Sequence, residues 1–265
     1  MAILYDGRPD SGAGIDDCRA VNSVPGYPSS IQIVDSPDGV GRMFRFEHFA
    51  DYPDIYSDAR VNRAMALEPN PDLRPPAERW YALDIYIPTV DDYRGVFPEH
   101  IRKVTLCQWH DSGWDDVLGR DVPLSITWLD NGAYLYIRSK SDSTFPPVAS
   151  PQSWSEQELA RYPAHNLRGR RVSMVMHVIW DYGPGGLCEL WIDHYPVFSK
   201  IGPIGFSGPE GVYFMNGLDH IKRTVNADQV VIYNTGGVIG NETSSYYEMT
   251  GRYPYPTVAQ RGALV

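Results

Sequence analysis

Alternation of apolar and polar residues with a period of two is the feature that most constrains the fold. It is clear in MFRFEHF (43–49) and RWYALDIYIP (79–88), and further strand signals follow in KVTLCQWH (103–110), GVYFMNGLDHI (211–221) and ADQVVIYNTGGVIG (227–240). This period is that of pleated strands, whose successive side chains point to opposite sides of a sheet. We therefore expect a chain built mainly of strands.

Turn signals separate these stretches at regular intervals. Asn131-Gly132 lies between two alternating runs in PLSITWLDNGAYLYIRS (123–139), which is a strong hairpin signal. A second hairpin is predicted over 170–199, with its turn at GPGG (183–186). At least ten strands without alternating helices predict an all-β antiparallel sandwich, a concanavalin-like jelly roll with few short helices, over residues 1–240.

Three other segments differ from this pattern. SWSEQELARY (153–162) predicts a short helix, with Ser153 or Ser155 as its N-cap. Segment 50–79 is rich in proline and charge and is expected to be a long loop, a kind of loop that is often functional. Residues 241–265 are rich in Tyr and Pro, and we expect a C-terminal arm rather than a second domain.

Composition narrows the class of partner. The net charge of −10 argues against general nucleic-acid binding. No run approaches the roughly 20 apolar residues of a membrane span, so no membrane partner is expected. The start MAILYDGRPDSG lacks signal-peptide features, which favours intracellular synthesis while export stays open. We expect an extracellular or virion-associated location. The sequence predicts no oligomeric state.

The cysteines and the familiar catalytic motifs exclude several chemistries. Three distant cysteines without CxxC spacing argue against a disulfide framework or zinc site, and Cys107 and Cys188 are expected to be buried free thiols. GxSxG, P-loop and HExxH motifs are absent. Glu189 and Asp193 share a strand face but lie about 13 Å apart along it. Glycosidase acids are closer, at roughly 5–9.5 Å, which disfavours a hydrolase.

The stretch VTLCQWHDSGWDD (104–116) carries the most distinctive polar pair. Gln108 and His110 are two apart and so share one strand face. Amide and guanidinium groups can stabilise the anion that forms when a proton leaves C5 of a uronic acid, and imidazole can remove that proton. A tyrosine hydroxyl can then protonate the leaving oxygen. Together these groups would form a minimal lyase site; the alternative is an ordinary solvated strand face.

RWYALDIYIP, VTLCQWHD, PLSITW, VSMVMHVIWD, LCELWIDHYPV and VYFMNGLDHI follow one another in an order that resembles jelly-roll polysaccharide lyases. The similarity is greatest to the heparin lyase I and family 20 (glucuronan) lyase group, and it covers roughly residues 40–235. It implies β-elimination on a uronic-acid-containing polysaccharide, with an anionic polysaccharide as the partner. It assigns no certain cofactor.

The resemblance also implies roles for single residues. Gln108 and His110 match the family's Q-x-H pair, and Tyr213, Phe214 and Gly217 match its late strand. The predicted catalytic residues are Gln108, His110, Arg63 and Tyr213. The predicted substrate-binding residues are Arg60, Trp109, Trp114, Tyr134, Tyr136, Asn216 and His220. Arg60 is also the alternative to Arg63 as the early arginine.

Two positions depart from the family pattern. Met215 stands where the family has lysine, and Asp219 stands where it has a late tyrosine that often acts as acid or base. Tyr134, Tyr136 or Tyr233 would be the substitutes for that tyrosine. The departures keep two alternatives open: a non-catalytic carbohydrate-binding module, phage- or surface-associated, and a glycoside hydrolase on the same scaffold.

The remaining polar and aromatic residues have structural interpretations as well. Asp111, Asp115 and Asp116 could ligate calcium, but a solvated acidic loop is the expected reading. His177 is expected to be a satisfied core or sheet-face histidine. Strand tryptophans are more often core than sugar platforms, and that expectation covers Trp80, Trp128, Trp180 and Trp191.

Overall fold

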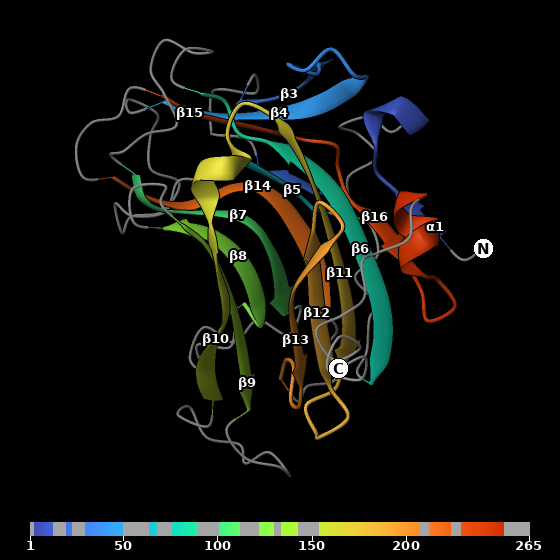
Figure 1. Ribbon diagram of the computed structural model, residues 1–265. Coiled ribbons are helices and arrows are strands. Elements are labelled where there is room, and N and C mark those ends of the chain that lie inside the picture. Colours follow the sequence, from blue (N-terminus) through green and yellow to red (C-terminus); the bar gives the residue numbers. More distant parts are fainter. Residues whose placement is uncertain are drawn as a thin grey trace, which may run out of the picture.

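The computed structural model describes residues 3–12, 20–22, 30–49, 64–67, 76–89, 101–111, 122–129, 134–142, 154–206, 212–223 and 229–251. Within these ranges the chain forms two antiparallel sheets, one of nine strands and one of seven, together with three short helical segments. The two sheets form the two layers seen in Figure 1. This confirms the predicted antiparallel sandwich.

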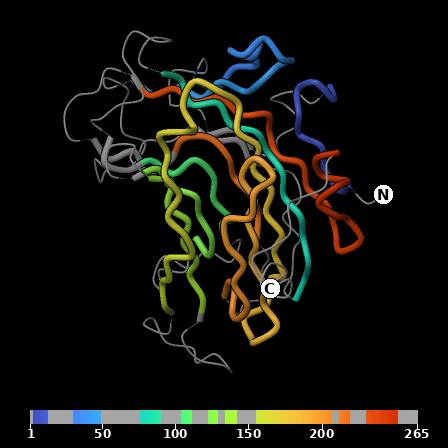
Figure 2. Tube along the Cα trace, viewed as in Figure 1, coloured from blue at the N-terminus to red at the C-terminus, as the bar shows by residue number. Residues whose placement is uncertain are grey.

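The nine-stranded sheet carries most of the C-terminal half of the chain. Its main path is β13 (Tyr195–Ile201), β12 (Leu187–Ile192), β11 (Arg171–Trp180), β6 (Ala77–Tyr86), β15 (Gln229–Asn234), β4 (Arg42–Phe49) and β3 (Ile31–Asp35). Off this path, β16 (Val238–Gly240) pairs with β6 and with β1 (Ile3–Asp6). The tube in Figure 2 shows how segments distant in sequence lie side by side in this layer.

The seven-stranded sheet combines segments from both halves of the chain. Its order is β10 (Trp154–Pro163), β9 (Tyr134–Asp142), β8 (Leu124–Leu129), β7 (Ile101–Asp111), β14 (Val212–Arg223), β5 (Ala64–Leu67) and β2 (Ala20–Asn22). The three helical segments are η1 (Pro9–Ser11), η4 (Ala164–Leu167) and α1 (Tyr246–Thr250). α1 lies beside β6, on the outside of the nine-stranded sheet (Figure 1).

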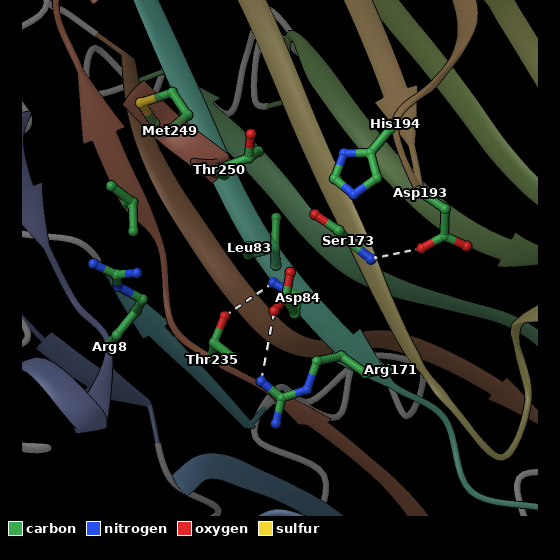
Figure 3. Close-up of a pocket in the computed structure, with 12 residues that line it drawn as sticks. Arg8, Leu83, Asp84, Arg171, Ser173, Asp193, His194, Thr235, Met249 and Thr250 are labelled. Carbon is green, nitrogen blue, oxygen red and sulfur yellow. Dashed lines mark hydrogen bonds and ion pairs between the residues drawn. The ribbon is translucent and has the colours of Figure 1, made fainter. Parts of the chain in front are cut away.

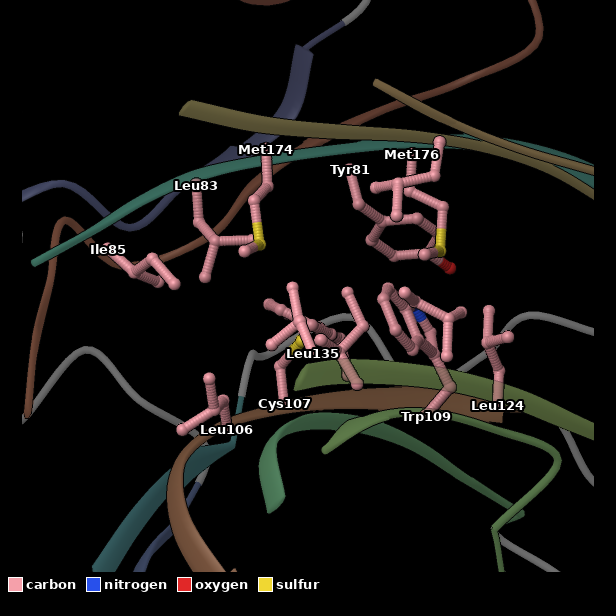
Figure 4. Packing of buried hydrophobic residues seen from close by; sticks show 14 of the residues in the cluster. Tyr81, Leu83, Ile85, Leu106, Cys107, Trp109, Leu124, Leu135, Met174 and Met176 are labelled. Atoms are coloured by element: carbon pink, nitrogen blue, oxygen red, sulfur yellow. The ribbon is translucent and has the colours of Figure 1, made fainter. Parts of the chain in front are cut away.

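The core lies between the two sheets, where each contributes alternate side chains. Figure 4 shows this packing, with one layer facing the other across Tyr81, Leu83, Ile85, Met174 and Met176 on one side and Leu106, Cys107, Trp109, Leu124 and Leu135 on the other. Trp128 and Trp180 are buried in this core as predicted. Trp191 is buried in a separate cluster with Ala82, Val175 and Tyr246, and Trp80 is only partly buried against that cluster. Cys107 and Cys188 are buried free thiols as predicted, and burial raises the pKa of both.

Both predicted hairpins are present. β8 and β9 pair antiparallel, with Leu129 opposite Tyr134, and the predicted turn residues Asn131 and Gly132 lie outside the described part of the chain. β11 and β12 pair with Ile179 opposite Leu187, which places the second turn at the predicted glycine-rich segment. In each case the turn joins two strands that each bury one face.

Two predictions need correction. Of the segment 153–162, predicted as a helix, residues 154–162 lie in strand β10, which pairs with β9 along its length. The predicted loop 50–79 contains strand β5 and the start of β6. The segment predicted as a C-terminal arm is a separate case, because the call of an arm rather than a second domain stays a prediction. Its described part contains helix α1, capped by Ser245, whose hydroxyl accepts a hydrogen bond from the Glu248 amide. Residues 252–265 lie outside the described part of the chain.

A β-bulge in β7 determines which side chains face outward. Thr105 pairs with Thr127, but Cys107 pairs with Ile126, so Leu106 is an extra residue. Leu106 and Cys107 both join the core, while the Thr105 and Thr127 hydroxyls contact each other at 3.3 Å on the outer face. Beyond the bulge, alternation directs Gln108 and His110 to that same outer face.

The turn between β3 and β4 is held by an ion pair that should make stability depend on acid pH. The Asp38 carboxylate accepts hydrogen bonds from Arg171 on β11 at 2.9 and 3.1 Å. Burial opposes ionisation, but hydrogen bonds from Arg171, Ser36 and the Val40 amide outweigh it and lower the pKa of Asp38 from 3.8 to about 2.

Because this folded-state pKa is lowered, the Asp38 carboxylate stabilises the fold above pH 3.8 and loses that contribution as the pH falls through about 2. We expect Asp38→Asn to flatten the fall in melting temperature over that acid range. Thermal unfolding followed by circular dichroism at a series of pH values measures this. Equal acid sensitivity in wild type and variant would contradict it.

Candidate active site

The outer face of the seven-stranded sheet carries the polar residues that the sequence pattern singled out. We call it the polar face. It is defined by Tyr213 and Met215 on β14, Gln108 and His110 on β7, Ser125 and Thr127 on β8, and Tyr134, Tyr136 and Arg138 on β9. The intervening residues of the same strands, such as Phe214 and Leu135, fill the core.

Gln108 and His110 are brought together as predicted, on one face of one strand. Their exposed fractions are 1% and 8%, so both polar side chains are nearly buried. The Gln108 amide nitrogen lies 3.7 Å from the Met215 sulfur on the neighbouring strand. A hydrogen bond in such a poorly solvated setting is stronger than the same bond in water, which suits groups that must stabilise a developing charge.

Tyr213 lies directly opposite His110 in the β7–β14 pairing. Their rings stack, with centroids 5.3 Å apart and planes 18° from parallel. Cross-strand neighbours of this kind have Cβ atoms roughly 4.5–5.5 Å apart, so a single sugar unit can reach both rings. An imidazole and a phenol therefore lie next to each other on the polar face.

The β8, β9 and β10 side of the polar face is charged. Arg138 donates from Nε to the Ser125 hydroxyl at 2.9 Å and from Nη1 to Glu156 at 2.8 Å. Arg161 lies over the rings of Tyr134 and Tyr136, at 5.5 and 5.8 Å from their centroids. Desolvation, reinforced by the nearby carboxylates of β10, raises the pKa of Tyr136, so this phenol stays protonated at neutral pH.

Two predicted substrate-binding residues point the wrong way. Trp109 lies between Gln108 and His110 in the strand, so it faces the core, where it is 1% exposed and packs edge-on against Tyr81. Asn216 lies between the outward-facing Met215 and Gly217 and is fully buried opposite Cys107. Neither side chain can contact a sugar from its observed position.

The structure describes the other predicted site residues to differing extents. Arg60, Arg63 and Trp114 lie outside the described part of the chain. His220 and Asp219 belong to β14, but only their place in the strand is described. Tyr134 and Tyr136 do lie on the polar face, and Tyr134 is 37% exposed. Tyr233 lies in the other sheet, where it contacts Tyr86 edge-on.

Sequence reasoning missed Ser125, Arg138 and Glu156. A usable signal was present, because Arg138 follows Tyr134 and Tyr136 at a spacing of two and must share their face. The contribution of β10 could not be found this way, because Glu156 was assigned to a helix.

The outer face of the nine-stranded sheet contains a cavity of about 310 Å³ (Figure 3). Its charged groups are already engaged in ion pairs: Arg171 with Asp38 and Asp84, and Arg8 with Asp6. Desolvation raises the pKa of Asp84, against the opposing effect of Arg171. The contacts recorded for these residues hold strands and turns together.

His177 is a satisfied sheet-face histidine, as predicted. Its ring nitrogens lie 2.8 Å from Glu78 and 3.1 Å from Glu189, and its ring stacks on Trp80 at 4.1 Å. Glu189 also accepts a hydrogen bond from Ser199. Because Glu189 is engaged in this cluster, its pairing with Asp193 as glycosidase acids gains no support.

Two further findings concern metal binding and membrane-spanning helices. They contain no group of three or more His, Cys, Asp or Glu side chains placed to hold a metal ion. The calcium alternative at Asp115 and Asp116 falls outside those residues, and Asp111 is described only as part of β7. Among the described helices, none has the length and apolar character needed to cross a membrane.

The fold is a sandwich of two antiparallel sheets that gathers histidine, tyrosine and glutamine on one outer face. The polysaccharide lyase family model matches residues 14–232, so the chain belongs to the polysaccharide lyase family. It is therefore a lyase, as predicted. No curated protein sequence matches the chain.

Solved structures share the fold at low sequence identity. The endo-β-1,4-glucuronan lyase of the fungus Trichoderma reesei superposes with a TM-score of 0.60 at 12% identity, covering 84% of this chain and 91% of that one. The exolytic PL7 alginate lyase AlyA5 of Zobellia galactanivorans gives 0.53 at 8%, covering 82% and 89%. The alginate lyase of Klebsiella pneumoniae gives 0.52 at 11%, covering 80% and 84%.

Proposed function

We propose that this lyase cleaves a uronic-acid-containing polysaccharide, of the glucuronan or alginate type, by β-elimination on the polar face. The observation that carries the proposal is the position of His110. Its ring stacks on Tyr213, and Gln108 lies two residues before it on the same face of β7. Family membership and the similarity to glucuronan and alginate lyases support the substrate class.

Each group has a chemical task in this proposal. Gln108 donates hydrogen bonds to the uronate carboxylate, with Arg63 or Arg60 as its cationic partner, so that negative charge at C5 is tolerated. His110 removes the C5 proton, and the electron pair forms the C4–C5 double bond as the C4–O bond breaks. Tyr213 protonates the departing oxygen. The products are a new chain end and an unsaturated uronic acid.

Further residues would position the polymer. Tyr134 and Tyr136 lie on the polar face and are proposed to contact neighbouring sugar units, together with Trp114 and His220. Aromatic side chains offer flat apolar surface to sugar rings while their polar groups stay hydrogen-bonded. Such polymers occur outside cells or on their surfaces, so we propose an extracellular or virion-associated site of action.

The test is to incubate the protein separately with glucuronan, alginate and heparin-type polymers. We expect ultraviolet absorbance from the unsaturated product with at least one glucuronan- or alginate-type polymer, because elimination creates a conjugated double bond. A matched incubation with a neutral glucan should give none, since it lacks the carboxylate that acidifies C5.

Two other results would reject the proposal in favour of its rivals. New reducing ends without the absorbing product would indicate a glycoside hydrolase. Retention of the polymer on the protein without any product would indicate a binding module.

A further inference from the structure

We propose that Arg138 is a substrate-binding residue that holds a uronate carboxylate on the polar face beside Gln108. This inference rests on the proposed function and adds a cation to it. Arg138 lies on β9, two strands from Gln108, and it was not among the residues expected from the sequence.

Strand register places Arg138 in line with the predicted site. Met215 pairs with Gln108, Gln108 with Ser125, and Ser125 with Arg138, so these four side chains form one row across the polar face. Two strand spacings separate the backbone of Gln108 from that of Arg138 by about 9.6 Å. The guanidinium reaches back across β8, because its Nε donates to the Ser125 hydroxyl at 2.9 Å.

Arg138 is the charged member of this row. Gln108 and Ser125 offer hydrogen bonds without charge, and the Met215 thioether is a weak acceptor at best. A polyuronate carries a carboxylate on each acidic unit, so binding it in this row without a cation would leave that charge poorly compensated. Arg138 is the group in the row that compensates it.

The guanidinium has donors left for a ligand. Arginine carries five N–H groups. One is used on Ser125 and one on Glu156, and within the described residues the other three donate no hydrogen bond. The side chain is 18% exposed, so it is held in place and still reachable. A planar guanidinium with an open edge is suited to bidentate contact with a carboxylate.

Glu156 keeps the guanidinium in position rather than saturating it. The Glu156 side chain is 36% exposed at 2.8 Å from Arg138, so water screens this pair and its contribution to stability is small. A substrate carboxylate that displaced water from the open edge would add a second, less solvated partner.

The test compares steady-state kinetics on the polymer that wild type cleaves best. We expect Arg138→Ala to raise KM by about 10- to 100-fold, the loss typical of a hydrogen bond to a charged group, with a smaller change in kcat. Arg138→Lys should fall between the two, because it keeps the charge and loses the fork. Added salt should raise KM more steeply in wild type than in Arg138→Ala.

Two matched variants separate binding from a structural role. Arg170→Ala removes the arginine that directly precedes β11 from its ion pair with Asp193 at 2.6 Å and should leave KM unchanged. Glu156→Gln removes the partner of Arg138 but leaves the guanidinium, so KM should stay within about 2-fold of wild type or fall. If Glu156→Gln raised KM as much as Arg138→Ala, Arg138 would serve only to tie β9 to β10.

Failure of this inference is distinct from failure of the proposed function. Wild type that yields no unsaturated product from any uronate polymer would reject the proposed function. If wild type cleaves the polymer and folded Arg138→Ala has the same KM, only the proposed role of Arg138 is overturned. If Arg138→Ala does not fold, unchanged KM in Arg138→Lys at low and high salt overturns it.

Discussion

His110→Ala should slow formation of the unsaturated product by about 100- to 10,000-fold, which is the usual contribution of a positioned acid–base group. The imidazole is the base in the proposed reaction, and alanine offers nothing to take the C5 proton. His110 lies on the outer face of β7, stacked on Tyr213 rather than packed in the core. Its loss should therefore affect rate much more than folding.

The measurement is kcat and KM from product absorbance, with thermal unfolding recorded for each protein. His194→Ala is a matched control, because this histidine lines the cavity of the nine-stranded sheet, where its Nδ1 lies 2.7 Å from the Tyr246 hydroxyl. Added imidazole should restore part of the rate in His110→Ala and none in a variant that lacks activity through misfolding. Undiminished activity in His110→Ala would remove His110 from the mechanism.

Trp180→Ala should lower the free energy of unfolding by about 3–5 kcal/mol, the range for deleting a large aromatic side chain from a core. Trp180 is fully buried between the sheets, and its indole N–H donates to the Tyr81 hydroxyl at 3.2 Å. The variant would leave a cavity and a buried hydroxyl without that donor. Both effects act in the same direction.

Urea or guanidinium unfolding followed by tryptophan fluorescence and circular dichroism measures this change. Tyr195→Ala is the matched control, because Tyr195 is 53% exposed at the edge strand β13. Its expected effect is within about 0.5 kcal/mol. Equal destabilisation by the two variants would contradict the assignment of Trp180 to the core.

Strands with one buried and one polar face could be predicted from the sequence, because their period of two is imposed by the sheet. Residues 79–86 of the predicted stretch 79–88 lie in β6, with Tyr81, Leu83 and Ile85 in the core. The prediction of a helix over residues 153–162 was wrong because β10 is an edge strand, and its exposed Glu156, Gln157 and Glu158 also suit a helix. Pairing with β9, which no local pattern reveals, decided its conformation.

The same rule explains which site residues were placed well. Gln108 and His110 followed from alternation within one strand. Trp109 was an error against that rule, because the residue between two outward-facing side chains faces inward. The alignment of Arg138 with Gln108 in one row depends on register across three strands, and one sequence does not specify it.

The pairing of β7 with β14 has a consequence for how the protein is made. Contacts such as Gln108 to Met215 join residues 107 positions apart, so neither strand alone forms a working surface. A chain growing from the ribosome must hold β7 without this neighbour until β14 emerges, and non-local pairing of this kind is slow. Fragments cut between the two strands should be inactive singly and regain activity only when they reassociate.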